Sequence, residues 1–348
     1  EYGGQGMPKI VATETEEIWH SANLTFSLSP LLTHGAIDAL EQHGSEELKA
    51  RYLPRLISGE WTGTMNLTEP QAGSDLAAVN CRAVPEGDHY KIYGQKIFIT
   101  WGDHQMTDNV IHLVLARLPD APAGVKGISL FLVPKFLLDE NGEPGERNDA
   151  SCISLEHKLG IHGSPTCVMS FGDGDGAVGY LVGEPHRGLM AMFTMMNDAR
   201  QSVGLQGLSV SERSYQQALA WAKERLQGTR SDGSRYPIID FPDVRRLLLL
   251  MKSGTEAMRA LAYLASAEID KAHFAADADR RASHMARVEL FTPIVKGWLT
   301  ELSQDQTTHR LHIHGAKRFI EQTATAHHKR QPPNTTNNQP TTPNHPKD

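Results

Sequence analysis

The sequence has few cysteines and no long apolar run. Its cysteines, Cys81, Cys152 and Cys167, are odd in number and unrelated in spacing, which fits buried thiols in a reducing compartment better than disulfides or a metal site. No apolar run approaches the roughly 18 residues that a membrane span requires. The opening, EYGGQGMPKI, has no basic segment followed by an apolar stretch, so it is not typical of a signal peptide. We therefore expect a cytoplasmic protein without a membrane span.

Long blocks of basic residues are also missing. The net charge is -7, and lysines and arginines are mixed with acidic residues throughout, which argues against a nucleic-acid partner. The 348 residues are 39% hydrophobic and 22% charged, as in an ordinary globular protein with two or three domains. The chain does not begin with Met, and we expect it to be truncated at both ends.

The residue pattern changes twice along the chain. Apolar residues have helical spacing from about 14 to 58, with a helix stop at Gly44 and a helix start at Ser45. Short β-rich runs broken by Gly, Pro and Asp fill 61–182, and no long helix separates them, which excludes parallel βαβ units. Long helical runs follow from Gly188, the third of them from about 286 to 302, which suggests an up-and-down bundle.

These patterns predict an α+β multidomain fold. We expect a partial N-terminal helical domain, an antiparallel β-barrel or sandwich and a C-terminal helix bundle, at 1–60, 61–184 and 185–330 respectively. Met192, Met195 and Met196 are expected in the core of the bundle. The final segment, 331–348, is rich in Pro, Asn and Thr and is expected to be disordered.

Two motifs resemble ligand sites but lack the right context. GDGAVG at 174–179 has the spacing of a dinucleotide-binding loop, yet a short apolar strand follows it instead of a helix, so a hairpin or loop is expected. A histidine cluster near the C-terminus has no H-x-x-x-H pair with a supporting carboxylate, so no metal site is expected. Its members are His309, His312, His314, His327 and His328.

The segment MNLTEPQAGSDLAAV, residues 65–79, has two readings. Pro, Gly, Ser and Asp suit any exit from a strand, and Asp75 is able to cap a short turn. Alternatively, the hydroxyls of Thr68 and Ser74, with Gly73 allowing close approach of the backbone, suit a phosphate or the polar edge of a ring. The segment alone does not decide between these readings.

Three segments together resemble the acyl-CoA dehydrogenase family, whose flavoproteins introduce a double bond between the α and β carbons of an acyl-CoA thioester. They are LTEPQAGSD at 67–75, GQKIFITWG at 94–102 and YLVGEPHRGLMAMFTMMNDARQSVGLQGL at 180–208, within a likeness that runs from about residue 1 to 330. The third segment is most similar to the long bacterial branch of the family. The resemblance implies FAD, an acyl-CoA substrate, an electron-transfer flavoprotein as partner, and a homodimer or homotetramer.

The resemblance also implies the cofactor-binding residues. Residues 65–68 would lie along the flavin, Thr68 at its pyrimidine edge, and Ser74 at the pyrophosphate and the CoA arm. Phe98 would stack near the isoalloxazine ring, and Thr100 would hydrogen-bond close to its reactive nitrogen; without the neighbouring motifs, Phe98 also fits a strand core. The full set is Met65, Leu67, Thr68, Gly73, Ser74, Phe98, Ile99, Thr100 and Arg225, the last reaching the FAD of a neighbouring subunit.

Ser74, Asn197, Asp198 and Arg200 are the implied substrate-binding residues. The α-proton requires a base, which in the family is usually a glutamate beyond a segment that appears here as HIHGAKRF at 312–319, and no matching glutamate follows. Ala199 occupies the alternative position of the base, and Asp198 is a poor substitute because of its helical phase. The catalytic residue is therefore unknown, and two alternatives stay open: a non-catalytic remnant of the fold and an acyl-CoA oxidase.

Overall fold

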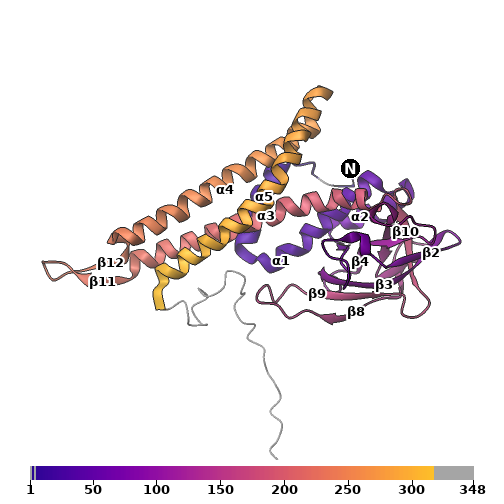
Figure 1. Ribbon diagram of the computed structural model, residues 1–348, viewed down its shortest axis with the longest axis horizontal. Coiled ribbons are helices and arrows are strands. Elements are labelled where there is room, and N and C mark those ends of the chain that lie inside the picture. The colour runs from indigo at the N-terminus through magenta and orange to yellow at the C-terminus, as the bar shows by residue number, and fades with distance from the viewer. Residues whose placement is uncertain (1, 4, 317–348) are drawn as a thin grey trace, which may run out of the picture.

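The computed structural model describes residues 2, 3 and 5–316, and it has a β-rich unit, with the N-terminal helices packed beside it, at one end of a bundle of long helices (Figure 1). The predicted tail at 331–348 lies outside the described residues. The helices are α1 (Lys9–His43), α2 (Glu46–Ser58), α3 (Gly188–Glu224), α4 (Pro242–Phe274) and α5 (Ala278–His314). The strands of the main sheet are β1 (Trp61–Asn66), β2 (Arg82–Glu86), β3 (His89–Thr100), β4 (Asn109–Arg117), β5 (Ile128–Pro134), β8 (Ala150–Leu155), β9 (Thr166–Phe171) and β10 (Ala177–Val182).

The predicted α+β fold is confirmed, including the helix boundary near Gly44. Gly44 ends α1, and the hydroxyl of Ser45 accepts a hydrogen bond from the backbone N–H of Leu48 at 3.2 Å, which caps the start of α2. The third bundle helix, α5, is longer than the predicted run of 286–302, because its ends carry few apolar residues that would mark it in the sequence.

The main sheet has eight strands in the order β1-β4-β5-β10-β3-β9-β8, with β2 pairing β3 and β4. Most pairs are antiparallel as expected, but β1 pairs β4 in parallel, with Trp61 opposite Asn109. The expected antiparallel arrangement thus holds for most of the sheet, but not for this pair or for the parallel bridge between β2 and β4, where Arg82 lies opposite Arg117. The return crossover between these strands is made by β2 and β3 instead of a helix, so the sequence carried no βαβ signal.

The sheet is apolar on both faces. Leu40, Leu53 and Met192 lie with Leu113 and Leu130 in a cluster shared by α1, α2, the sheet and the start of α3. A second cluster fills the other face of the sheet and includes buried residues of β3, β4, β5 and β9. One face of the sheet thus packs against α1, α2 and the start of α3, and the other face packs against a core formed by the strands themselves. This close packing makes the sheet a rigid base for the loops at its edges.

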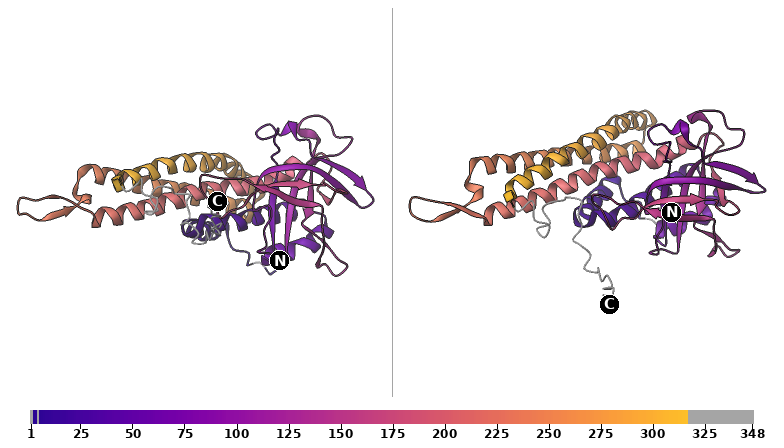
Figure 2. Two further views of the ribbon diagram at one scale, coloured as in Figure 1. Left: turned by 90° about the horizontal axis from the view of Figure 1, so that it is seen from below. Right: turned by 60° about the horizontal axis from the view of Figure 1, so that its bottom comes forward.

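α3, α4 and α5 run side by side away from the sheet, as the two views of Figure 2 agree. Met192 and Met195 are fully buried and Met196 is partly buried, so the prediction that these residues belong to the core is confirmed. Two small hairpins were not predicted from the sequence. They are β6 (Phe136–Leu138) with β7 (Pro144–Arg147), and β11 (Leu226–Thr229) with β12 (Arg235–Pro237), which lies at the far end of the bundle (Figure 1).

Candidate functional site

The loop after β1 combines a closed backbone with exposed small residues. Glu69 and Ala72 exchange backbone hydrogen bonds of 2.9 and 3.0 Å, which closes the loop into a tight turn. Gly73 and Ser74 are exposed beyond this turn, and a Cβ atom added to Gly73 would meet nothing within 4 Å. Asp75 caps the short 3₁₀ helix Leu76–Ala78 by accepting a hydrogen bond from the N–H of Ala77, so the simpler reading holds for Asp75.

Strand β3 lies directly beside this loop. The N–H of Ile97 donates to the carbonyl of Thr68 at 2.9 Å, which joins the two predicted cofactor-binding segments. The register of β3 against β9 shifts between Lys96 and Ile99, and Phe98 has φ of 62° at this irregularity. As a result the Phe98 side chain is 57% exposed, although Ile99 beside it is buried. An aromatic ring held outward by a left-handed backbone is costly for a residue with a Cβ and is typical of a functional position.

Lys96 and Glu69 form a buried ion pair behind these two segments. Lys96 Nζ lies 2.7 Å from Glu69 Oε1, and the side chains of Lys96 and Glu69 are 0% and 3% exposed. Burial raises the pKa of the Glu69 carboxyl, but the attraction of Lys96 and the hydrogen bonds from backbone N–H groups more than offset this and lower the pKa. The sequence analysis missed both residues. The sequence held only a weak signal: Lys96 follows Gly94 and Gln95 and directly precedes the apolar run 97–99, and a lysine buried in such a strand requires a partner.

The other predicted binding residues of the loop and strand differ in exposure. Leu67 and Ile99 are buried, so only their backbone groups are available to a ligand. Met65, Thr68 and Thr100 are half-buried.

Apart from Ser74, the predicted substrate-binding residues lie in the first half of α3. Arg200 donates to Asn197 Oδ1 at 3.2 Å, and its guanidinium lies 5.5 Å from the ring centre of Phe193. Asp198 points toward the N-terminal helix instead, with its Oδ1 2.8 Å from Lys9 Nζ. Burial lowers the pKa of Lys9, but Asp198 and Glu16 outweigh burial and raise it above its ordinary value. Asp198 is therefore engaged in an ion pair.

Arg225 is not brought together with the other predicted residues. It caps the C-terminal end of α3, is exposed, and donates to the carbonyl of Leu226 and the side chain of Gln227. This end of α3 lies beside the β11–β12 hairpin, at the opposite end of the bundle from the sheet (Figure 1). Within one chain, Arg225 is therefore remote from Phe98.

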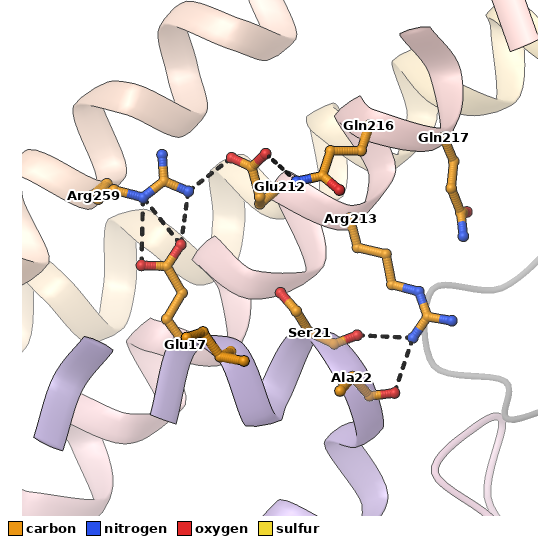
Figure 3. Close-up of a pocket in the computed structure, with 9 residues that line it drawn as sticks. Glu17, Ser21, Ala22, Glu212, Arg213, Gln216, Gln217 and Arg259 are labelled. Atoms are coloured by element: carbon orange, nitrogen blue, oxygen red, sulfur yellow. Dashed lines mark hydrogen bonds and ion pairs between the residues drawn. The ribbon is translucent and has the colours of Figure 1, made fainter. Parts of the chain in front are cut away.

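A polar cavity of about 660 Å³ lies between α1, α3 and α4 (Figure 3). Arg259 bridges Glu17 and Glu212 on its wall, with N–O distances of 2.7 Å to each. Arg213 donates to the carbonyls of Ser21 and Ala22 (Figure 3), next to Asn23, whose non-helical backbone kinks α1. None of the predicted site residues lines this cavity, and its charged groups already have partners: Arg259 pairs with both glutamates, and Arg213 is held by backbone carbonyls.

The last two sequence candidates are the 174–179 segment and the histidines near the C-terminus. Residues 174–176 form a loop after β9 and residues 177–179 begin β10, so a loop and a strand stand here and not the start of a helix, as expected. His314 stacks on Trp221 at the end of α5, with ring centres 5.4 Å apart. No cluster of three potential metal ligands occurs among residues 2, 3 and 5–316, while His327 and His328 lie outside this range. In the same part of the chain, no helix combines the length and apolar character needed to cross a membrane.

Three models of acyl-CoA dehydrogenase domains match successive parts of the chain. The N-terminal domain matches residues 1–60, the middle domain matches 64–173, and the C-terminal domain matches 186–333. The chain therefore belongs to the acyl-CoA dehydrogenase family.

Among individual proteins, the chain is similar to the 3-methylmercaptopropionyl-CoA dehydrogenase of Ruegeria pomeroyi, with 52% identity over 94% of this chain and 55% of the relative. A butyryl-CoA dehydrogenase of Syntrophomonas wolfei is 39% identical over 92% of this chain and 54% of the relative. The chain thus spans about half the length of these curated relatives. The structure of butyryl-CoA dehydrogenase from Megasphaera elsdenii has the same fold, with a TM-score of 0.77 and 24% identity over 94% of this chain and 78% of that one.

Proposed function

We propose that this chain binds FAD between the 68–74 loop and residues 98–100 of β3, and that it dehydrogenates an acyl-CoA thioester between the α and β carbons. The observation that carries this proposal is the outward ring of Phe98, whose backbone has φ of 62°, beside Ile97, whose N–H donates to the carbonyl of Thr68 in the loop. When bound, FAD would accept the hydride equivalent from the β carbon while a base removes the α-proton.

The residues present suit such a cofactor. Phe98 offers an exposed aromatic face for a planar ring, and the half-buried Thr68 and Thr100 offer hydroxyl groups at its sides. The open space beside Gly73 and the exposed hydroxyl of Ser74 suit a phosphate group. Backbone groups of residues 65, 67 and 99 complete the proposed set, since the side chains at 67 and 99 are buried.

The substrate would lie between Ser74 and the start of α3. Arg200 and Asn197 present a cation and an amide there, which suit a polar acyl-CoA arm. Asp198 remains part of the proposed set, but its carboxylate is held by Lys9, so we assign it to positioning the helix and not to proton abstraction.

A non-catalytic protein that keeps the fold and the cofactor is the second candidate. It is favoured by Ala199 at the alternative position of the base and by the ion pair of Asp198, which together leave the α-proton without an assigned acceptor. An acyl-CoA oxidase, with oxygen as the electron acceptor, is the third.

We further propose a homodimer or homotetramer in the cytoplasm, with an electron-transfer flavoprotein as the electron acceptor. The exposed position of Arg225 at the far end of α3 supports the oligomer, since this residue is too remote to reach the FAD of its own chain (Figure 1). The thiols of Cys81, Cys152 and Cys167 are all free, which suits a reducing compartment.

The test is to add FAD to the purified chain and then mix the complex anaerobically with acyl-CoA thioesters. Dehydrogenation predicts that the flavin absorbance bleaches. A yellow complex that no thioester bleaches supports the non-catalytic protein, and peroxide formation in air supports the oxidase. A chain that stays colourless with added FAD contradicts the whole proposal.

A further inference from the structure

Glu69 and Lys96 are not exposed to any ligand, yet they lie between the two segments of the candidate site. Lys96 Nζ donates to Glu69 Oε1 at 2.7 Å and to the carbonyl of Leu67 at 2.9 Å. It therefore attaches β3 to the loop at two points, immediately before and immediately after Thr68.

The carboxylate of Glu69 also binds the far end of the connection between β1 and β2, beyond the 68–74 loop. Its oxygens accept hydrogen bonds from the backbone N–H groups of Asn80 and Cys81, at 2.7 and 3.1 Å, and from the side chain of Gln71 at 2.6 Å. Together with Lys96, these donors account for the acceptor capacity of the carboxylate. One buried carboxylate thus joins both ends of the β1–β2 connection to each other and to β3.

We propose that the Glu69–Lys96 pair is a positioning device, which sets the separation between the 68–74 loop and Phe98 that the flavin requires. This inference rests on the proposed function. Apolar residues of similar size would suffice for stability alone, because buried ion pairs are often matched by them. What such residues would not supply is the set of directional hydrogen bonds that fixes where Thr68 lies relative to Phe98.

The experiment compares Lys96→Met, the double variant Glu69→Gln/Lys96→Met and a control, Lys91→Met. Lys91 lies on the same strand and pairs with Asp175 at 3.0 Å, but Asp175 is exposed and distant in sequence from the loop. The measurements are the melting temperature, the FAD dissociation constant, the visible circular dichroism of bound FAD, and hydrogen exchange at the amide of Ile97 in the apoprotein.

Lys96→Met is expected to lower the melting temperature and to weaken FAD binding by about tenfold or more, because Glu69 is left as an uncompensated buried charge. The double variant is expected to regain part of the melting temperature, because the uncompensated charge is gone, while FAD binding stays weak, the dichroism stays altered and the Ile97 amide exchanges faster. Lys91→Met should change FAD binding less than about twofold.

A double variant that regains both stability and FAD affinity would overturn this inference, since the pair would then serve stability only. Unchanged exchange at Ile97 in the double variant would overturn it as well. If the unmodified chain itself binds no FAD, the proposed function fails first, and the inference fails with it.

Discussion

Replacing Phe98 with Ala is expected to weaken FAD binding much more than it weakens the fold. Phe98 is 57% exposed, which leaves about 110 Å² of a typical Phe residue for a ligand to cover. At about 25 cal/mol per Å² this area corresponds to about 3 kcal/mol. Association also costs freedom of motion, so only part of this free energy appears as affinity. We therefore expect a loss of about 1–2 kcal/mol of binding free energy, or a rise in the dissociation constant of about 5- to 30-fold.

The assay is a titration of apoprotein with FAD, followed by quenching of flavin fluorescence. Phe274→Ala is the matched control, because Phe274 is 72% exposed at the end of α4 and is not one of the proposed binding residues. Ala also carries a Cβ, so the backbone strain at φ of 62° is the same before and after the change. A Phe98→Ala dissociation constant within about twofold of the unmodified chain would refute the stacking role.

Three further predictions follow from the described contacts. Gly188→Ala should destabilise the chain by about 1–3 kcal/mol in urea unfolding, because its Cβ would lie 2.2 Å from backbone atoms of Ser129 and Leu130. Gly73 has open space around it, so Gly73→Ala should change the stability by less than about 0.5 kcal/mol and yet weaken FAD binding. Equal losses of stability in the two variants would contradict this prediction. Hydrogen bonds from His284 and Lys271 lower the pKa of Glu268 to about 2. The ionised carboxylate should therefore stabilise the fold fully above the ordinary pKa of 4.5, and this stabilisation should fade as the pH falls toward 2. Glu268→Gln should remove this part of the acid dependence of the urea midpoint, and an unchanged pH profile would argue against the prediction. Asp198→Asn should cost about 1–3 kcal/mol of stability, because Glu16, at 3.5 Å, is then the remaining ion-pair partner of Lys9. The rate of flavin bleaching per bound thioester should fall by less than about tenfold. A larger loss of rate would identify Asp198 as the base.

The sequence predicted the order of the elements well where local chemistry is decisive. Gly44 and Ser45 mark a helix boundary by their own conformational and capping preferences, and the structure has the boundary there. The strand runs that contain β3 and β4 were recognisable from β-branched and aromatic residues alone. β8 carries a weaker pattern of this kind, because its residues such as Ile153 and Leu155 alternate with polar ones at the edge of the sheet.

The candidate site could be predicted only in part. The motifs indicated Thr68, Ser74 and Phe98, but they did not show that Glu69 and Lys96 join the two segments from behind. They also did not show that Asp198 faces Lys9, since these two residues are 189 positions apart in the sequence.

By itself the sequence determined which segments become helices and strands, and which family pattern they carry, because propensities, caps and motifs act over a few neighbouring residues. Only the tertiary structure decided the parallel pairing of β1 with β4, the outward turn of the Phe98 ring and the partners of the buried charges. These features depend on which distant segments meet when the apolar faces are buried, and on the need of each buried charge to find a partner there.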